Sequence, residues 1–423
     1  MVWHIKRSIF WFRKHVWGSL GPGLITGAAD DDPSGIATYS IAGAQLGTRL
    51  LWTALITWPL MAAVQMMCAR IGMVSGRGLT AAFKTKFPRW LVTTVITALL
   101  VANTINVAAD LAGMADAAEM LTHVSSHIWV IVFAITISWA TVRLRYYQIA
   151  KTLKWLALVL FSYVITAFVI QPDWSVALRD TFIPHMPKGR EEWQTLVAIL
   201  GTTISPYLFF WQATQEVEEE RAAGRNTLAQ RKGATRKQIL TRKFDVGTGT
   251  FFSNLVMYFI ILTAAFTLHR SGQTTIETSQ QAAAALLPLA GRLATTLYTL
   301  GIVGVGLLAI PTLTGSAAYA FAELRGWKQG LDRRLKQARS FYIMILASTV
   351  AAVIMDFMNV GAVKALFWTA VINGVLAPFL LIAVLVVASD SKVMVGQPSS
   401  RLGKTVVAVA MIVMFVAAIV MFL

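Results

Sequence analysis

The chain has 423 residues, of which 56% are hydrophobic and 13% charged, and its mean hydropathy is +0.63. Soluble domains carry about 25% charged residues, so this composition excludes a soluble globular protein and predicts a membrane protein with many spans. The formal charge of +17 would suit a nucleic-acid partner, but the positions of Lys and Arg attribute it to membrane topology instead.

The first apolar segment, residues 20–46, is interrupted by a polar stretch. Residues 27–35 read Gly-Ala-Ala-Asp-Asp-Asp-Pro-Ser-Gly, and each Asp at mid-membrane raises the insertion free energy by about 2.5–3.5 kcal/mol. Pro33 removes a backbone donor, and the Ser-Gly pair after it disfavours continued helix. One interpretation is a kinked helix with Asp30 to Asp32 near an interface. We favour the other, an unwound helix with a cation site at the membrane centre.

Eleven apolar segments follow one another along the chain, and most have the roughly 17–25 residues that cross the hydrocarbon core. They lie at about 20–46, 50–74, 91–120, 127–142, 155–171, 193–216, 245–268, 286–322, 340–357, 361–388 and 404–423. The fourth is short and the eighth is long, so their boundaries are open.

Lys and Arg fall mainly on alternate sides of these segments. Thirty of the 37 lie at the N-terminus or in the loops 70–90, 143–154, 217–245, 323–339 and 389–404. The positive-inside rule therefore predicts a cytoplasmic N-terminus and, with eleven spans, a C-terminus outside. The first span has no clear cleavage site, so we expect it to be retained.

A second interrupted helix is predicted in the sixth segment, where Gly201-Thr202-Thr203-Ile204-Ser205-Pro206-Tyr207 again places a proline in mid-span. It opens the second group of five segments as residues 20–46 open the first. Interrupted helices at matching places in two halves indicate an inverted-repeat transporter with its site at the midplane. We expect one transport domain over 1–423, with repeats at 1–172 and 193–388 and an extra terminal helix at 404–423.

Several short motifs lie along spans one to ten: Gly21-Pro22-Gly23, Asp32-Pro33-Ser34-Gly35, Ala109-Asp110, Ser205-Pro206-Tyr207, Thr314-Gly315 and Ala377-Pro378-Phe379. In this set the chain resembles the NRAMP divalent-metal transporters, which have Asp-Pro-Gly-Asn in the first span and Met-Pro-His in the sixth. The resemblance implies an all-α, LeuT-like fold of two inverted five-helix repeats plus an eleventh helix, with helices 1 and 6 discontinuous.

The resemblance also implies a metal site, and the chain departs from the family within it. Asp32 takes the place of the metal-binding Asp, whereas Gly35 stands where the family has a coordinating Asn. Ser205 stands where the family has the Met whose thioether contacts the ion, and Thr202 falls where a backbone carbonyl of the unwound sixth span contacts it. The implied site loses a soft sulfur and an amide and keeps oxygen ligands.

Asp30 and Asp31 are extra acids where the family usually has uncharged residues. We expect Asp31 to contribute to the metal site, and both to form a negative vestibule that concentrates cations. Oxygen ligands suit Mg²⁺ or Mn²⁺, and small side chains leave room for an ion that keeps its water. The pattern is similar to the NRAMP-related magnesium transporters.

The same comparison implies that proton coupling is impaired. Asn103 and Gly113 stand where the family has acids in span three, and Tyr207 replaces the family's His. Asp110 remains, either as part of a proton path or as a hydrogen-bonded structural carboxylate. Arg339, at the start of span nine, resembles a proton-path arginine but is also suited to anchoring at the interface.

We therefore expect an alternating-access transporter of Mg²⁺, and of Mn²⁺ as a further ion, without obligatory proton symport. The alternatives are a proton-coupled Mn²⁺/Fe²⁺ symporter of NRAMP type and a LeuT-like symporter of organic solutes. An enzyme is not expected, because no nucleophile elbow, P-loop or HExxH motif is present. We expect a bacterial inner membrane, with the divalent cation and the lipid bilayer as partners, and no nucleic acid, cofactor or obligate protein partner.

Overall fold

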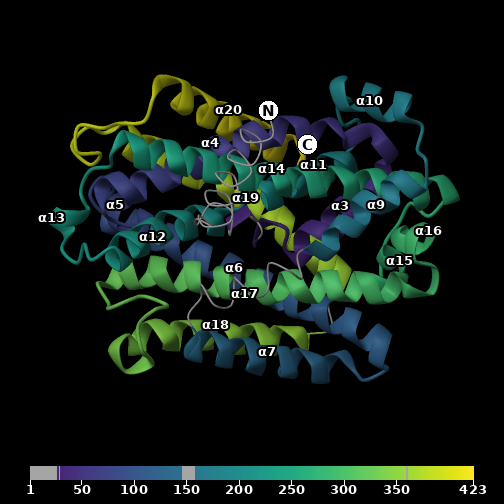
Figure 1. The fold of residues 1–423 in the computed structure, drawn as a ribbon, viewed down its shortest axis with the longest axis horizontal. Helices are drawn as coiled ribbons and strands as arrows, with labels where there is room; N and C mark the ends of the chain where they lie inside the picture. The colour runs from purple at the N-terminus through teal and green to yellow at the C-terminus, as the bar shows by residue number, and fades with distance from the viewer. Residues whose placement is uncertain (1–25, 28, 145–157, 359–360) are drawn as a thin grey trace, which may run out of the picture.

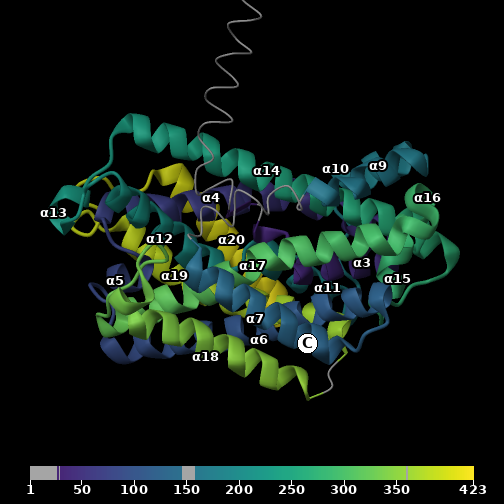
Figure 2. The same ribbon diagram turned by 60° about the horizontal axis from the view of Figure 1, so that its bottom comes forward.

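The computed structural model describes residues 26–27, 29–144, 158–358 and 361–423, and every regular element within these ranges is a helix. Figure 1 shows the long helices lying side by side along the longest axis, and Figure 2 shows the same bundle turned by 60°. The prediction of an all-α protein is confirmed for this part of the chain.

The first half contains α3 (Pro33–Leu46), α4 (Trp52–Ser75), α5 (Leu79–Phe83), α6 (Arg89–Thr122), α7 (Ser126–Arg143), α9 (Phe161–Val169) and α10 (Trp174–Phe182). The second half begins with α11 (Arg190–Thr203), α12 (Pro206–Ala222), α13 (Leu228–Arg231) and α14 (Arg236–Thr267). It continues with α15 (Ser279–Ala283), α16 (Leu287–Ala290), α17 (Ala294–Arg325), α18 (Arg339–Asp356) and α19 (Ala362–Ser389), and α20 (Arg401–Val420) follows.

The described residues contain nine helical stretches long and apolar enough to cross a membrane, and these match nine of the eleven predicted segments. The short fourth segment forms the 18-residue helix α7, and the long eighth one is mostly α17. The other two predicted segments, 20–46 and 155–171, begin outside the described residues, as does the Gly21-Pro22-Gly23 motif; their described parts contain α3 and α9.

Both predicted helix breaks are present. The first helix is interrupted at Asp31 and Asp32 and resumes at Pro33 as α3. The sixth predicted segment is interrupted in the same way, because α11 ends at Thr203 and α12 starts at Pro206. Proline lacks an amide hydrogen and suits the first position of a helix, which explains why the new helix begins at each proline.

The two broken helices lie at the centre of the bundle, where α3 packs against α11, α14 and α19. Small residues allow this close packing. A Cβ on Gly43 of α3 would overlap the carbonyl oxygen of Ile261 in α14, and a Cβ on Gly201 of α11 would overlap that of Ala370 in α19. Larger residues at these two positions would push the helices apart.

Four of the loops rich in Lys and Arg meet at one end of the bundle, which we call the basic end: 70–90, 217–245, 323–339 and 389–404. The Nζ atom of Lys84 donates to the carbonyl of Leu324 at 3.0 Å, and Arg70 donates to the carbonyl of Gln397 at 3.0 Å. Gly233 donates to the carbonyl of Val74 at 2.8 Å. The labels α5 and α13 mark this end in Figure 1, while α10 and α16 mark the opposite end. The side of the membrane that each end faces stays a prediction.

Candidate metal centre

Asp32 lies at the first helix break and is 1% exposed. Its Oδ1 atom accepts hydrogen bonds from the amide of Gly35 at 2.8 Å and from the hydroxyl of Ser34 at 2.6 Å, so Asp32 caps α3. Its Oδ2 atom accepts from the side-chain amide of Asn106 in α6 at 3.3 Å and from the hydroxyl of Tyr207 in α12 at 3.4 Å. One carboxylate therefore joins three elements of the bundle.

Tyr207 also connects the two helix breaks. Its hydroxyl lies 2.9 Å from the carbonyl oxygen of Ala29, which belongs to the turn just before the first break. Tyr207 is the second residue of α12 and is fully buried. Tyr207 stands where the family that the sequence resembles has His, and here the phenol holds the two interrupted helices together.

Ser205 and Thr202 line the second break. The Ser205 hydroxyl lies 2.7 Å from the carbonyl oxygen of Thr202 and 2.8 Å from that of Gly201, so it is turned back onto the end of α11. The predicted ligand atom of Thr202, its carbonyl oxygen, is thus bonded to Ser205 in this conformation. The Thr202 hydroxyl is buried and lies against the phenol of Tyr39.

Gly35 brings Thr202 close to Asp32. A Cβ built on Gly35 would lie 3.1 Å from the Thr202 hydroxyl oxygen and 3.6 Å from Oδ1 of Asp32. A side chain at position 35 would therefore fill the space between these two oxygen atoms. The structure brings together Asp32, Gly35, Thr202 and Ser205, four of the five residues predicted for the metal site.

Two buried oxygen atoms near the first break have no hydrogen-bond partner, Oδ1 of Asn106 and Oδ1 of Asp30. The Asp110 carboxylate lies against the backbone amide of Ser34, and the Thr202 hydroxyl lies against the phenol of Tyr39. Buried polar groups are normally bonded, and leaving one unbonded costs about 1–3 kcal/mol. Asn106 and Asp110 lie one turn apart on α6, so their side chains share a helix face. Most of these oxygen atoms are pure acceptors, which a hydrated cation would satisfy.

These oxygen atoms are hard ligands. Carboxylate, amide and hydroxyl oxygens are the ligands that Mg²⁺ and Mn²⁺ prefer. Within the described residues, no group of three or more His, Cys, Asp or Glu side chains lies close enough to hold a metal by itself. A cation held here would therefore need hydroxyl, amide, backbone or water oxygens beside Asp32.

Asp30 and Asp31 face a different helix from Asp32. Both lie within hydrogen-bond distance of the Ser253 hydroxyl in α14, which is 2.7 Å from Oδ2 of Asp30 and 3.1 Å from Oδ1 of Asp31. Their exposed fractions are 0% and 5%. In this conformation they are packed against α14, and they do not line an open vestibule.

The predicted proton-path residues are separated. Asp110 is buried in α6, whereas Arg339 is exposed at the first position of α18. Asn103 donates to the carbonyl of Leu313 at 3.0 Å and to the hydroxyl of Ser316 at 2.9 Å, so its amide binds α6 to α17. The contact of Asn106 with Asp32 was missed by the sequence analysis, although its spacing from Asp110 could have indicated it.

A protein-family model described as "Natural resistance-associated macrophage protein-like" (Nramp) matches residues 23–423. The divalent metal cation transporter MntH of Yersinia pestis (strain Pestoides F) is 27% identical over 357 residues, covering 82% of this chain and 83% of the relative. MntH of Erwinia tasmaniensis is 27% identical over 326 residues, covering 74% of each chain.

Solved structures of transporters share the fold. A manganese transporter of Eremococcus coleocola, crystallised with an aromatic bis-isothiourea substituted compound, matches with a TM-score of 0.70 at 16% identity, covering 96% of this chain and 87% of that one. Mhp1, a nucleobase-cation-symport-1 family transporter in a closed conformation, matches with a TM-score of 0.57 at 14% identity, covering 95% and 89%. The LeuT-like fold predicted from the sequence is confirmed.

Proposed function

The chain belongs to the natural resistance-associated macrophage protein-like family, and from that premise we propose that it carries divalent metal cations across a membrane, with Mg²⁺ as its principal ion. The ion would bind between the two helix breaks and pass by alternating access. Relatives that cover most of this chain are named as transporters of divalent metal cations, so the protein is a transporter and not an enzyme.

One observation carries the proposal. The carboxylate of Asp32 lies among other buried oxygen atoms, those of Asn106, Asp110 and Thr202, and Oδ1 of Asn106 has no hydrogen-bond partner. A divalent cation with part of its water shell would supply both positive charge and hydrogen-bond donors to this set. Mg²⁺ loses its water reluctantly and is usually held by one or two carboxylates, which matches a site with few carboxylates.

The small residues at the breaks favour Mg²⁺ over softer metals. Ser205 offers a hydroxyl where the resembling family has a thioether, and thioether sulfur favours softer transition metals. Gly35 leaves the space beside Thr202 and Asp32 open. Mn²⁺ would also accept these oxygen ligands, and manganese is the ion named for the Eremococcus coleocola transporter. A proton-coupled Mn²⁺ carrier is therefore the alternative.

Transport without obligatory proton movement is part of the proposal. Asn103 is used in packing between α6 and α17, and Asp110 is the acid that remains near Asp32 on α6. The four histidines within the described residues lie at helix ends or between helices: His123, His127, His185 and His269. A central imidazole relay is thus lacking in that part of the chain.

The predicted topology completes the proposal. The protein would lie in a bacterial inner membrane with its basic end and N-terminus in the cytoplasm and its C-terminus outside. Residues 1–172 and 193–388 would form the two inverted repeats, and 404–423 the terminal helix. The gathering of basic loops at one end of the bundle supports this orientation.

Ion uptake into proteoliposomes tests the proposed function. We expect the purified protein to carry Mg²⁺ and, in competition, Mn²⁺, at fixed pH and without a pH gradient. Asp32→Asn, which keeps the capping oxygen but removes the charge, is the matched inactive control. Uptake of Fe²⁺ or Mn²⁺ with exclusion of Mg²⁺ would favour the proton-coupled alternative. Ion-dependent uptake of an organic solute without metal transport would favour the LeuT-like symporter.

A further inference from the structure

Arg242 lies in the second turn of α14 at the basic end, and its guanidinium group contacts three carboxylates. It pairs with Glu216 of α12 at 2.7 Å and with Asp245 one turn further along α14 at 2.6 Å. It also pairs with Glu219 of α12. The Arg242 side chain is 10% exposed and that of Glu216 only 1%. This single arginine therefore binds α12 to α14 in a largely buried setting.

The contacts continue from Arg242 to the first helix. Oε1 of Glu216, which pairs with Arg242, also accepts a hydrogen bond from the side-chain amide of Gln212 at 2.7 Å. The Gln212 side-chain oxygen in turn accepts from the hydroxyl of Thr26 at 2.8 Å. Thr26 lies just before the first break, so three elements are joined through this chain of contacts.

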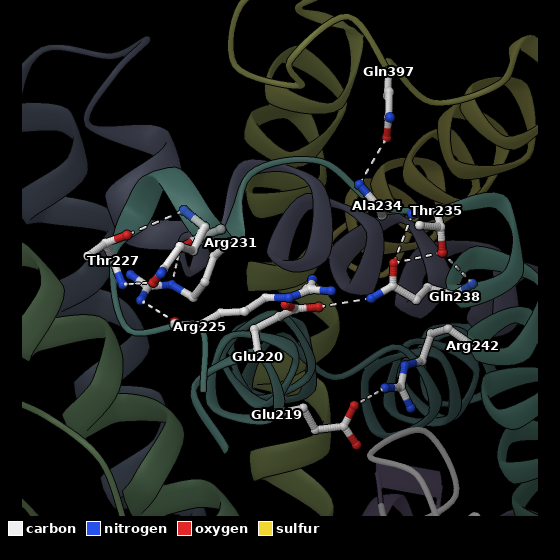
Figure 3. Close-up of polar contacts among 12 residues, drawn as sticks. Glu219, Glu220, Arg225, Thr227, Arg231, Ala234, Thr235, Gln238, Arg242 and Gln397 are labelled. Atoms are coloured by element: carbon white, nitrogen blue, oxygen red, sulfur yellow. Dashed lines mark hydrogen bonds and ion pairs between the residues drawn. The ribbon is translucent and has the colours of Figure 1, made fainter. Parts of the chain in front are cut away.

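We call this set the Arg242 clasp: Thr26, Gln212, Glu216, Glu219, Arg242 and Asp245. Figure 3 shows how Arg242 and Glu219 face each other across α12 and α14, while Arg225 and Gln238 contact Glu220 nearby. Arg231, in the same loop, donates to backbone carbonyls, among them that of Asn226 at 2.7 Å. Of these contacts, those of Arg242 connect to the first helix, through Glu216 and Gln212.

The clasp lies between the helix breaks and the basic end. Arg242 precedes Ser253, the α14 residue that contacts Asp30 and Asp31, by three helical turns. At 1.5 Å per residue this is about 16 Å along α14. A cation leaving the breaks toward the basic end would therefore have to pass the level at which the clasp joins the helices.

We infer that Arg242 is a positioning residue of the transport cycle, which holds the first helix, α12 and α14 together and so closes the path to the basic end. The inference rests on the proposed alternating-access function. Charge-assisted hydrogen bonds are about twice as strong as neutral ones, and a buried setting strengthens them further. The closed state is favoured while the clasp is formed, and opening toward the basic end requires its contacts to separate.

Thiol labelling measures this opening without any transport. Cys68 is the only cysteine and is buried, so a Cys68→Ser background accepts one reporter. Ser253→Cys places a nearly isosteric thiol beneath the clasp, at a position that is 2% exposed. A membrane-impermeant thiol reagent is then applied to intact spheroplasts and to inverted membrane vesicles, and the labelling rate is compared between variants.

We expect Arg242→Gln to raise the labelling rate by about tenfold or more, in one membrane orientation only, because it removes the charge that closes the clasp. A tenfold shift in the population of the open state corresponds to about 1.4 kcal/mol. Arg242→Lys should restore slow labelling in part, because it keeps the charge. Gln212→Met should raise the rate less, since it breaks the link to Thr26 but leaves no buried charge unpaired. It also serves as the test if Arg242→Gln does not fold.

Arg225→Gln is the matched control, because among the described residues the Arg225 guanidinium pairs with Glu220 of α12 and not with a residue of the first helix. It should leave the labelling rate unchanged. The inference fails if folded Arg242→Gln and Gln212→Met are labelled at the parent rate, or if Arg225→Gln accelerates labelling equally. If Arg242→Gln is labelled faster but the parent protein does not carry Mg²⁺, the role of the clasp is supported and only the proposed ion is rejected.

Discussion

The side-chain amide of Asn106 lies 3.3 Å from Oδ2 of Asp32, where α6 faces the break before α3. Gly35 replaces the asparagine that the resembling family has in the first span, so an amide is absent there. The structure has an amide beside the same carboxylate, but α6 supplies it. The other end of this amide, Oδ1 of Asn106, is buried without a partner.

Replacing Asn106 should weaken ion binding. Asn106→Leu removes a hydrogen bond to a carboxylate, and such bonds contribute about 1.5–3 kcal/mol, so we expect the apparent Kd for Mg²⁺ to rise by about tenfold or more. Asn103→Leu is the control, because Asn103 lies nearly one turn away on α6 and binds α17 instead. Equal losses of affinity in both variants would indicate a general effect of disturbing α6.

The charge of Asp32 is expected to be indispensable. Asp32→Asn keeps an oxygen that can cap α3 but leaves a cation without its carboxylate, and removing one partner of a buried charge pair costs about 3–5 kcal/mol. Mg²⁺ uptake in proteoliposomes should fall by about 100-fold to 1,000-fold or more, with little change in thermal stability. Wild-type affinity in this variant would remove Asp32 from the site.

Asp31 should matter less than Asp32. Its carboxylate faces Ser253 of α14, so it acts on the ion through its electrostatic field and not as a direct ligand. Electrostatic focusing raises the local concentration of counter-ions by about tenfold or more. We expect Asp31→Asn to lower apparent affinity by roughly tenfold, as measured by concentration-dependent uptake. An effect equal to that of Asp32→Asn would make Asp31 a direct ligand, and a silent variant would end its assignment to the site.

The helix breaks could be predicted from the sequence because their signals are local. Proline beside small polar residues in an apolar segment disrupts a helix wherever it occurs, and Pro33 and Pro206 each start a new helix. Capping by Asp32 follows equally from the residue type. These features depend on a few neighbouring residues, so no knowledge of the tertiary packing was needed.

Contacts across helices could not be predicted in the same way. Asn106 reaches Asp32 from 74 positions away, and Ser253 reaches Asp30 from 223 positions away. Such pairs depend on the rotation of α6 and α14 about their axes, and a uniformly apolar helix gives little indication of its rotation. The resemblance supplied the positions at the breaks but not these partners.

Mg²⁺ uptake should proceed without stoichiometric proton movement. Asn103 is engaged with α17, and exposed Arg339 is not positioned beside buried Asp110. When an ionophore compensates the charge, the fluorescence of a pH-sensitive dye inside the liposomes should therefore stay constant while Mg²⁺ enters. Acidification in proportion to uptake would contradict this and would implicate Asp110, which Asp110→Asn would then test.

Ion selectivity should depend on the space between the two breaks. The oxygen atoms of Thr202 and Asp32 lie 3.1 and 3.6 Å from where a Cβ on Gly35 would be. An asparagine there would enter the space that a hydrated ion would use. Ser205 directly precedes α12 at the second break, and its hydroxyl is a hard ligand.

Ser205→Met together with Gly35→Asn would rebuild the ligand set of the resembling family. The thioether gives no advantage to Mg²⁺ but favours softer ions, and the smaller cavity disfavours an ion that keeps its water. We expect the ratio of Mg²⁺ to Mn²⁺ uptake to fall by about tenfold or more, a change of about 1.4 kcal/mol in relative preference. The single variant Ser205→Ala, which removes the hydroxyl without adding sulfur or bulk, is the control. Because the ratio is compared within each variant, a general loss of activity does not mimic the effect, and an unchanged ratio in an active double variant would show that these two positions do not set the selectivity.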